Sequence, residues 1–318
     1  MHRRRVRRST PEGAHRPVML DEILAALAPQ PGEIVVDCTL GFAGHSAELL
    51  QRIGPTGRLF AFDLDASNLP PAQEQLSAIA PSFTLTHGNF AGFPATLAAE
   101  GIEGCDCLLA DLGMSSMQVD ESERGFSFMR DGPLDMRMDP SRGRTAAELL
   151  KTMPAEDLAS AFRDLGDEPD AERIAEAIVR CRETQPLERT RELTELILKE
   201  APVKVNPNPL PGEPTVRQQE IRPTARVFQA LRILVNRELA NLQELLRVLP
   251  WCLKPGGRVA ILSFHSGEDR LVKAAFREGV RSGVYQSASE EPMRPDYSEK
   301  MDNPRSRSAK MRWAIRRA

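Results

Sequence analysis

The chain has 318 residues, a formal net charge of −3, 41% hydrophobic and 27% charged residues, values typical of a globular protein with up to two domains. No apolar run approaches 18 residues, and no apolar core follows the basic N-terminus. We therefore expect no membrane span, no signal peptide and a cytoplasmic location. The five cysteines include no C-x-x-C pair, so we expect free thiols and no metal site.

Basic side chains gather at both ends of the chain. Residues 1–16 are predicted to form a flexible basic arm, and its first eight residues include five arginines. Basic ends on a mildly acidic body predict phosphate contacts and a nucleic-acid partner, with solvated tails as the alternative. The last sixteen residues carry six basic and no acidic side chains: Arg305, Arg307, Lys310, Arg312, Arg316 and Arg317.

Residues 33–53 predict a strand, a glycine turn and a helix. The β-branched run at 34–36 is typical of a buried parallel strand, and Gly41 and Gly44 allow the backbone to approach a ligand closely. The turn lacks the G-x-G-x-x-G spacing of dinucleotide-binding proteins, and Asp37 at the strand end would repel a pyrophosphate. An acid there suits an amine-bearing ligand, such as the methionine part of S-adenosylmethionine; an ordinary turn without a ligand is the alternative.

Two further strands are predicted at 57–65 and 82–86. Asp63 lies about twenty residues beyond the glycine turn, where an acid can accept both hydroxyls of a ribose. Asp65 competes for this role. Phe90, in the loop after the third strand, either stacks on a flat base or packs in the core.

A fourth strand at 105–110 leads into the loop 111–116. Ligands of open parallel sheets bind at the carboxyl ends of the strands, so chemistry is expected at this loop, which includes Ser115 and Ser116. A plain structural domain has little reason to place acids at three strand ends. These acids are Asp37, Asp63 and Asp111.

The regular alternation of strands and helices then stops. Residues 120–144 form a long polar loop, which either stacks on bases through its Arg and aromatic side chains or folds over a ligand as a lid. Helical periodicity runs from 145 to 200, with a capping box at Thr145, and a linker with six prolines follows at 201–223.

The strand and helix alternation resumes after the linker. We expect one amphipathic helix at 227–249, a fifth strand at 259–264, a poorly ordered stretch at 279–303 and a last strand at 309–317. The predicted organisation is a basic arm at 1–16, a discontinuous α/β domain at 17–140 and 222–318, and an inserted helical domain with its linker at 141–221.

Seven motifs, in this order, resemble those of the RsmH (MraW) family of bacterial 16S ribosomal RNA cytosine-N4 methyltransferases. The resemblance runs from about His15 to Arg312. The motifs are Asp37-Cys-Thr-Leu-Gly-Phe-Ala-Gly-His45, Asp111-Leu-Gly-Met-Ser-Ser116, Arg124-Gly-Phe-Ser-Phe128, Pro133-Leu-Asp-Met-Arg-Met138, Phe228-Gln-Ala-Leu-Arg-Ile233, Ser263-Phe-His-Ser-Gly-Glu-Asp-Arg270 and Asn303-Pro-Arg-Ser-Arg-Ser-Ala-Lys310.

The resemblance implies an α/β fold, namely the Rossmann-like sheet of class I S-adenosylmethionine-dependent methyltransferases with an inserted all-helical domain. It implies S-adenosylmethionine as the cofactor and N4 of a cytidine in the decoding region of 16S rRNA, in the small ribosomal subunit, as the methyl acceptor. It is also compatible with a homodimer.

The resemblance also carries site residues over by position. Those expected to bind the cofactor are Ala43, Gly44, His45, Asp63, Phe90, Asp111 and Gln118. Those expected near the substrate are Ser115, Ser116, Arg137 and His265, where a structural role for the histidine is the alternative. Asp111 is the candidate catalytic residue, as an acceptor for an N–H of the cytosine amine; a role in holding the cofactor alone is the alternative.

The chain departs from the family pattern at Phe42 and Ala43, where glycines are usual. Alanine tolerates a positive φ poorly, so this turn is expected to be reshaped and cofactor affinity lowered. A non-catalytic RNA-binding or ribosome-assembly protein with a weakened cofactor site is therefore the alternative function. The missing G-x-G-x-x-G argues against an NAD-dependent oxidoreductase.

Overall fold

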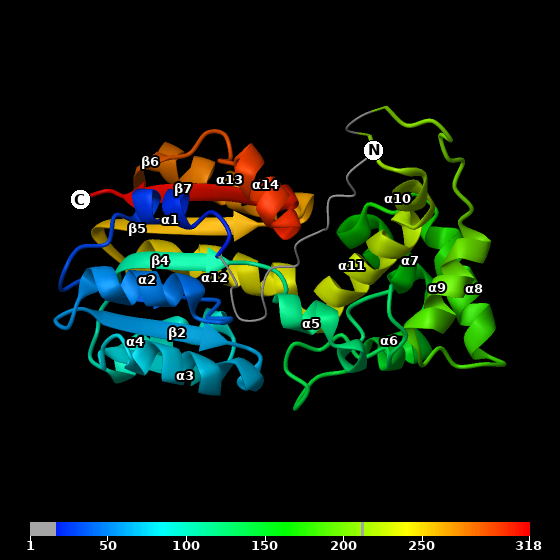
Figure 1. Cartoon of the computed structure of the whole chain (residues 1–318), viewed down its shortest axis with the longest axis horizontal. Helices are drawn as coiled ribbons and strands as arrows, with labels where there is room; N and C mark the ends of the chain where they lie inside the picture. The colour runs from blue at the N-terminus through cyan, green and yellow to red at the C-terminus, as the bar shows by residue number, and fades with distance from the viewer. Residues whose placement is uncertain (1–16, 211–212) are drawn as a thin grey trace, which may run out of the picture. The chain divides into compact units, whose positions relative to one another are not determined.

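The computed structural model describes residues 17–210 and 213–318, so the predicted basic arm at 1–16 lies outside the described residues. The chain divides into two compact units (Figure 1). The first runs to Gly113 and resumes at Asn241, and the second comprises Met114–Ala240.

A seven-stranded sheet forms the centre of the first unit, in the order β3-β2-β1-β4-β5-β7-β6. The first five strands are parallel, and β7 runs antiparallel to both β5 and β6. The strands are β1 (Ile34–Asp37), β2 (Arg58–Asp63), β3 (Phe83–His87), β4 (Cys105–Asp111), β5 (Leu253–Ser263), β6 (Tyr285–Ala288) and β7 (Lys310–Arg316). The five predicted parallel strands and the predicted last strand are confirmed.

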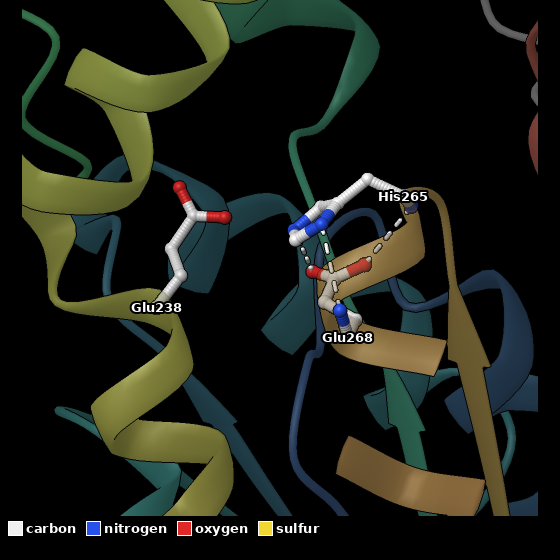
Figure 2. A group of neighbouring side chains, drawn as sticks. All are labelled: Glu238, His265 and Glu268. Atoms are coloured by element: carbon white, nitrogen blue, oxygen red, sulfur yellow. Dashed lines mark hydrogen bonds and ion pairs between the residues drawn. The ribbon is translucent and has the colours of Figure 1, made fainter. Parts of the chain in front are cut away.

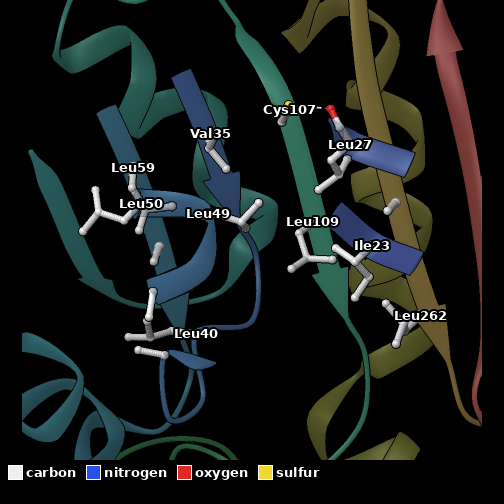
Figure 3. Packing of buried hydrophobic residues seen from close by; sticks show 14 of the residues in the cluster. Ile23, Leu27, Val35, Leu40, Leu49, Leu50, Leu59, Cys107, Leu109 and Leu262 are labelled. Carbon is white, nitrogen blue, oxygen red and sulfur yellow. Dashed lines mark hydrogen bonds between the residues drawn. The ribbon is translucent and has the colours of Figure 1, made fainter. Parts of the chain in front are cut away.

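Helices cover both faces of this sheet, which explains why its central strands β1, β2 and β4 are mostly apolar. Successive residues point to opposite faces, so Val35 and Val36 of β1 lie in different clusters. Figure 3 shows the first cluster, in which Ile23 and Leu49 pack against Leu109. Its helices are α1 (Leu20–Leu27), α2 (Gly44–Ile53) and α3 (Leu69–Ser77). The other face carries α4 (Phe93–Ala99), α12 (Glu238–Cys252) and α13 (Ser266–Arg281).

The second unit is helical and keeps the predicted capping box. Thr145 Oγ1 accepts from the Glu148 N–H at 3.1 Å, and Glu148 Oε2 accepts from the Thr145 N–H at 2.8 Å. The unit's helices are α5 (Ser116–Asp120), α6 (Ala146–Thr152), α7 (Ala155–Gly166), α8 (Ala171–Arg182), α9 (Thr190–Glu200), α10 (Val216–Glu220) and α11 (Arg222–Asn236).

The described residues also include the 3₁₀ turns η1 (Ala66–Asn68), η2 (Phe90–Gly92), η3 (Ser122–Arg124) and η4 (Pro304–Ser308).

The polar loop before Thr145 packs within the helical unit, so this unit begins earlier than the boundary predicted at residue 141. The Leu134 N–H donates to Glu188 O at 2.8 Å, and the Gly132 N–H donates to Thr190 Oγ1 at 3.0 Å. Asn236 of α11 receives the Met138 N–H at 2.7 Å, so α11 also belongs to this unit. These contacts are long-range in sequence, and composition alone does not reveal them.

Two sequence predictions are wrong in detail. The helix predicted at 227–249 is interrupted at Arg237, whose φ of 54° separates α11 from α12. Its apolar period continues across this single residue, so periodicity does not reveal the break. The stretch expected to be poorly ordered at 279–303 contains β6 and α14 (Tyr297–Asp302). β6 is short and partly polar, and pairing with β7 gives it its place in the sheet. In the described part of the chain, no helix is long and apolar enough to cross a membrane.

Gly279→Ala should destabilise the first unit by about 1–3 kcal/mol, because a Cβ there would lie 2.5 Å from Cε2 of the buried Tyr285 ring. This ring packs edge-on against Phe276 at 5.6 Å, so it has little freedom to move. The clash outweighs the gain of about 1 kcal/mol in helix propensity. Urea unfolding measures the change. Gly88→Ala is the control, since its Cβ would meet nothing closer than 4.0 Å; equal stability of the two variants would contradict the packing argument.

Candidate active site

Three carboxylates lie at the carboxyl edge of the sheet, where β1, β2 and β4 end side by side (Figure 1). Asp37 ends β1, Asp63 ends β2 and Asp111 ends β4. β1 pairs with both other strands in parallel, so the three ends meet at one edge. The clustering predicted from the sequence is thus present, and the three acids differ in what each contacts.

Asp37 is fully buried and holds the glycine turn. Its Oδ2 accepts from Ser46 Oγ at 2.6 Å, and its Oδ1 accepts from the Thr39 N–H at 3.0 Å. Burial raises the pKa of this carboxyl, and those two hydrogen bonds oppose the rise. Asp37 therefore links the turn to the first turn of α2, which corrects the expectation that its side chain faces an amine-bearing ligand.

The turn between β1 and α2 keeps two left-handed residues. Gly41 has a φ of +50°, and its N–H donates to Asp63 Oδ2 at 2.8 Å. Ala43 has a φ of 58°, a conformation that costs an alanine on the order of 1 kcal/mol, and it is completely buried. A Cβ at Gly44 would lie 2.6 Å from Pro17 Cγ, so this position has no room for a side chain. The turn thus accommodates Ala43 in a left-handed conformation at the cost of backbone strain.

Asp63 retains one free acceptor position. Its Oδ2 accepts from the Gly41 N–H and from Asn68 Nδ2 at 3.1 Å, and its Oδ1 accepts from the Asp65 N–H at 2.8 Å. A carboxylate offers about four acceptor positions, so one remains for a ligand hydroxyl. The competing Asp65 is 3% exposed, and its Oδ1 caps η1 by accepting from Ser67 N and Oγ. Asp63 is thus the better placed of the two acids.

Asp111 has the most unusual environment of the three. Its side chain is 24% exposed, yet its Oδ1 is buried without a hydrogen-bond partner among the described residues. Burial raises its pKa to about 6; nearby His45 opposes the rise, and Asp37 and Glu268 add to it. Its own N–H donates to Thr39 Oγ1 at 2.7 Å. Asp111 therefore offers an unpaired acceptor whose charge changes close to neutral pH.

His45 connects Asp111 to the segment before α1. Its ring is 7% exposed, with Nε2 at 3.0 Å from Val18 O and Nδ1 at 3.7 Å from Asp111 Oδ2. A carbonyl oxygen only accepts, so Nε2 carries a proton, and Nδ1 is the ring nitrogen that lies nearest the carboxylate. Both ring nitrogens thus face protein groups, which favours a role for His45 in positioning Asp111.

His265 has the structural role that sequence reasoning left open. It precedes α13, where its Nδ1 accepts from the Glu268 N–H at 3.4 Å (Figure 2). Glu268 is 2% exposed; its Oε2 accepts from the Phe264 N–H at 2.8 Å, and its Oε1 lies 3.3 Å from His265 Nε2. The pair caps α13. Glu238, also labelled in Figure 2, belongs to the second unit.

The remaining candidates have local partners. Phe90 begins η2 and packs partly buried against the core cluster that contains Phe93. In the second unit, Gln118 is 6% exposed and its Oε1 accepts from the Ser115 N–H at 3.1 Å. Arg137 forms a two-pronged ion pair with Asp135, at 2.8 and 2.7 Å. The side chain of the remaining candidate, Ser116, lies outside the described residues.

Two residues of this edge were missed by sequence reasoning. Thr39 accepts from the Asp111 N–H and donates its own N–H to Asp37, so it joins two of the acids. An aspartate followed two residues later by threonine is a turn signal that could have revealed it. Glu268 stands three residues after His265, the spacing of a capping box, and that spacing is a usable signal too.

The basic C-terminal stretch contacts the protein itself, which corrects part of the phosphate prediction. Arg312 is 2% exposed; its Nε donates to Asp269 Oδ1 at 2.7 Å and its Nη1 to Glu290 O at 3.0 Å. Lys310 also pairs with Asp269, at 3.4 Å, and Arg316 donates to Leu253 O. Arg312 in particular is not available to a phosphate.

A mostly parallel α/β sheet with acids at its ligand edge and no dinucleotide fingerprint is compatible with the Rossmann-like fold of a methyltransferase. Residues 12–317 match the model of the MraW methylase family. The chain belongs to this family of S-adenosylmethionine-dependent methyltransferases. The predicted family, fold class and cofactor are thereby confirmed.

Individual relatives align along nearly the whole chain. A protein of Geobacter sp. (strain M21) named ribosomal RNA small subunit methyltransferase H is 41% identical, over 94% of this chain and 97% of its own. A protein of the same name from Syntrophotalea carbinolica is 43% identical, over 95% and 98%. A solved rRNA methylase from Streptococcus thermophilus covers 94% of each chain, but its TM-score of 0.42 and identity of 11% are too low to support an argument.

Asp111→Asn should stabilise the protein at pH 7.5 by about 1–2 kcal/mol and have little effect at pH 4. The folded carboxyl has its pKa raised from 3.8 to about 6, so the folded chain binds the extra proton between these values. Wild-type stability therefore falls as pH rises through this window, and the neutral amide avoids the loss. Because a quarter of the side chain is exposed, we expect less than the full shift would give.

Urea unfolding at pH 4, 6 and 7.5 tests this expectation. The matched control is Asp302→Asn, which neutralises an exposed aspartate at the end of α14. A variant no more stable than wild type at pH 7.5 would show that burial does not penalise the Asp111 charge.

Proposed function

We propose that this chain transfers the methyl group of S-adenosylmethionine to the exocyclic N4 of a cytidine in the decoding region of 16S ribosomal RNA. The relatives named ribosomal RNA small subunit methyltransferase H support the substrate class. The proposal rests chiefly on the Asp111 carboxylate. Its buried Oδ1 has no hydrogen-bond partner among the described residues, and its pKa is raised to about 6. The choice of N4 rests on the motif resemblance.

The residues at the carboxyl edge fit this cofactor. S-adenosylmethionine carries an ammonium group and a sulfonium, and the buried Oδ1 of Asp111 lacks the donor that a cationic group supplies. The fourth acceptor position of Asp63 would receive a ribose hydroxyl. Phe90, partly buried at the neighbouring edge, would contact the flat adenine. Gly44 would contribute backbone at the start of α2.

Bound S-adenosylmethionine supplies a methyl group that is already activated, so the protein's main task is to align it with the acceptor nitrogen. The cytosine amine is a weak nucleophile because its lone pair is delocalised into the ring. An oxygen that accepts one of its N–H bonds helps to localise this lone pair as the new bond forms. Asp111 and the backbone carbonyls of residues 112–116 are candidates for that acceptor.

Asp111 can accept from the cofactor or from the cytosine amine through its buried Oδ1, which has no hydrogen-bond partner among the described residues. We assign Asp111 first to the cofactor, because the cation of the bound cofactor offsets the cost of burying the carboxylate charge. In this assignment, His45 lies beside the carboxylate, and Thr39 holds the backbone of Asp111 by accepting from its N–H. Acceptance from the cytosine amine is the second assignment, and kinetics separates the two.

The product of the reaction tests the function directly. Incubation with S-adenosylmethionine and either 16S rRNA or small subunits that lack the modification should yield N4-methylcytidine in nuclease digests analysed by mass spectrometry. Methylation only at C5 or at a ribose hydroxyl would contradict the N4 assignment. The absence of both cofactor binding in calorimetry and methyl transfer would favour the non-catalytic assembly protein, to which the strained Ala43 points.

Asp111→Asn is the informative variant in this assay. If Asp111 holds only the cofactor, KM for S-adenosylmethionine rises by about tenfold or more and kcat changes little. A fall in kcat at saturating cofactor would place Asp111 on the cytosine amine instead. Asp302→Asn again serves as the exposed control.

A further inference from the structure

We propose that the outward face of α13 binds the phosphate backbone of the RNA substrate, an inference that rests on the proposed function. The face consists of Arg270, Lys273, Arg277 and Arg281, all exposed. They stand three or four residues apart and so form one stripe along the helix. They line a shallow hollow of about 490 Å³ together with Ala274 and Glu278.

The acids of α13 are turned away from this stripe. By sequence the helix has four basic and three acidic side chains and looks nearly neutral. In the structure, Glu268 is 2% exposed and caps the helix, and Asp269 binds Arg312 and Lys310 of β7. Burial alone would raise the pKa of Asp269, but these two cations hold it below its usual value. Only Glu278 joins the outward face, so the helix is strongly polarised.

Three of the four cations are available for a ligand. Glu278 pairs with Arg281 at 2.8 Å, and none of the described acids forms an ion pair with Arg270, Lys273 or Arg277. Three exposed arginines on other helices each pair with an acid one helical turn away: Arg52 with Glu48, Arg180 with Glu176, and Arg191 with Glu195. Unpaired cations in a row are the arrangement that a polyanion recognises.

The stripe begins at the proposed catalytic edge. Leu262 of β5 pairs in register with Asp111, and α13 starts four residues later at Ser266. At 1.5 Å per residue, Arg270 lies about 6 Å and Arg281 about 22 Å along the helix from that start. An RNA strand that presents its target base at the edge can therefore continue along the stripe.

The overall charge makes such a local surface necessary. The chain has a net charge of −3, so it has no general attraction for RNA and must concentrate its cations where the strand passes. Arg312, one of the six C-terminal basic residues predicted to contact phosphate, is buried and serves instead to neutralise Asp269. With Asp269 neutralised in this way, Glu278 is the one acid of α13 on the outward face.

The test compares two triple variants with equal charge change. Arg270→Gln, Lys273→Gln and Arg277→Gln remove the unpaired cations and keep good helix formers. Arg52→Gln, Arg180→Gln and Arg191→Gln are the matched control on cations that already have acid partners. Affinity for a transcribed 16S rRNA fragment is measured against salt concentration, and S-adenosylmethionine binding is measured on each protein as a check on folding.

For the α13 triple variant we expect the slope of log affinity against log salt to fall by about 2, since three phosphate contacts are lost. This corresponds to roughly 100-fold weaker binding at 0.1 M salt if the affinities converge near 1 M. Cofactor binding should be unchanged. A slope equal to that of the control would show that the stripe is merely solvated and would overturn the inference. Failure of the wild-type protein to bind the RNA would overturn the proposed rRNA substrate as well.

Discussion

Three partly or fully buried carboxylates at one edge of the sheet determine how the rest of the site is built. A buried charge is costly unless donors surround it. Asp37 obtains its donors from Thr39 and Ser46, and Asp63 obtains them from the glycine turn and Asn68. These bonds fix the turn and the start of α2. Among the described residues, Asp111 keeps a buried oxygen without a hydrogen-bond partner and Asp63 keeps one acceptor position, so the edge leaves two places for a ligand to complete.

Sequence reasoning predicted the framework well, because the signals it needs are local. Alternating strands and helices, the glycine turn and the Thr145 capping box each depend on a few neighbouring residues, and the structure contains all of them. It also predicted that acids gather at the strand ends, since parallel strands must end at the same edge. It did not distinguish Asp37 from Asp111, because their different roles depend on burial and on donors from other segments.

Long-range packing also explains the errors. The helix break at Arg237 lies inside an uninterrupted apolar period, and β6 acquires its place only by pairing with β7. The end of the chain looks basic in sequence, yet Arg312 is buried against Asp269. The same ion pair turns an acid of α13 inward and leaves its outer face positive. The burial of Arg312 and the positive outer face of α13 thus both follow from the way in which β7 packs on α13.

If the Asp111 carboxylate binds the cationic cofactor, the affinity for the cofactor must depend on pH through the ionisation of this group. With its pKa near 6, ionised Asp111 is progressively lost below that pH. Calorimetry from pH 5 to 8 should show S-adenosylmethionine affinity falling below about pH 6 in the wild type and varying much less in Asp111→Asn. A wild-type affinity that is flat across this range, or identical pH profiles in the two proteins, would contradict the account.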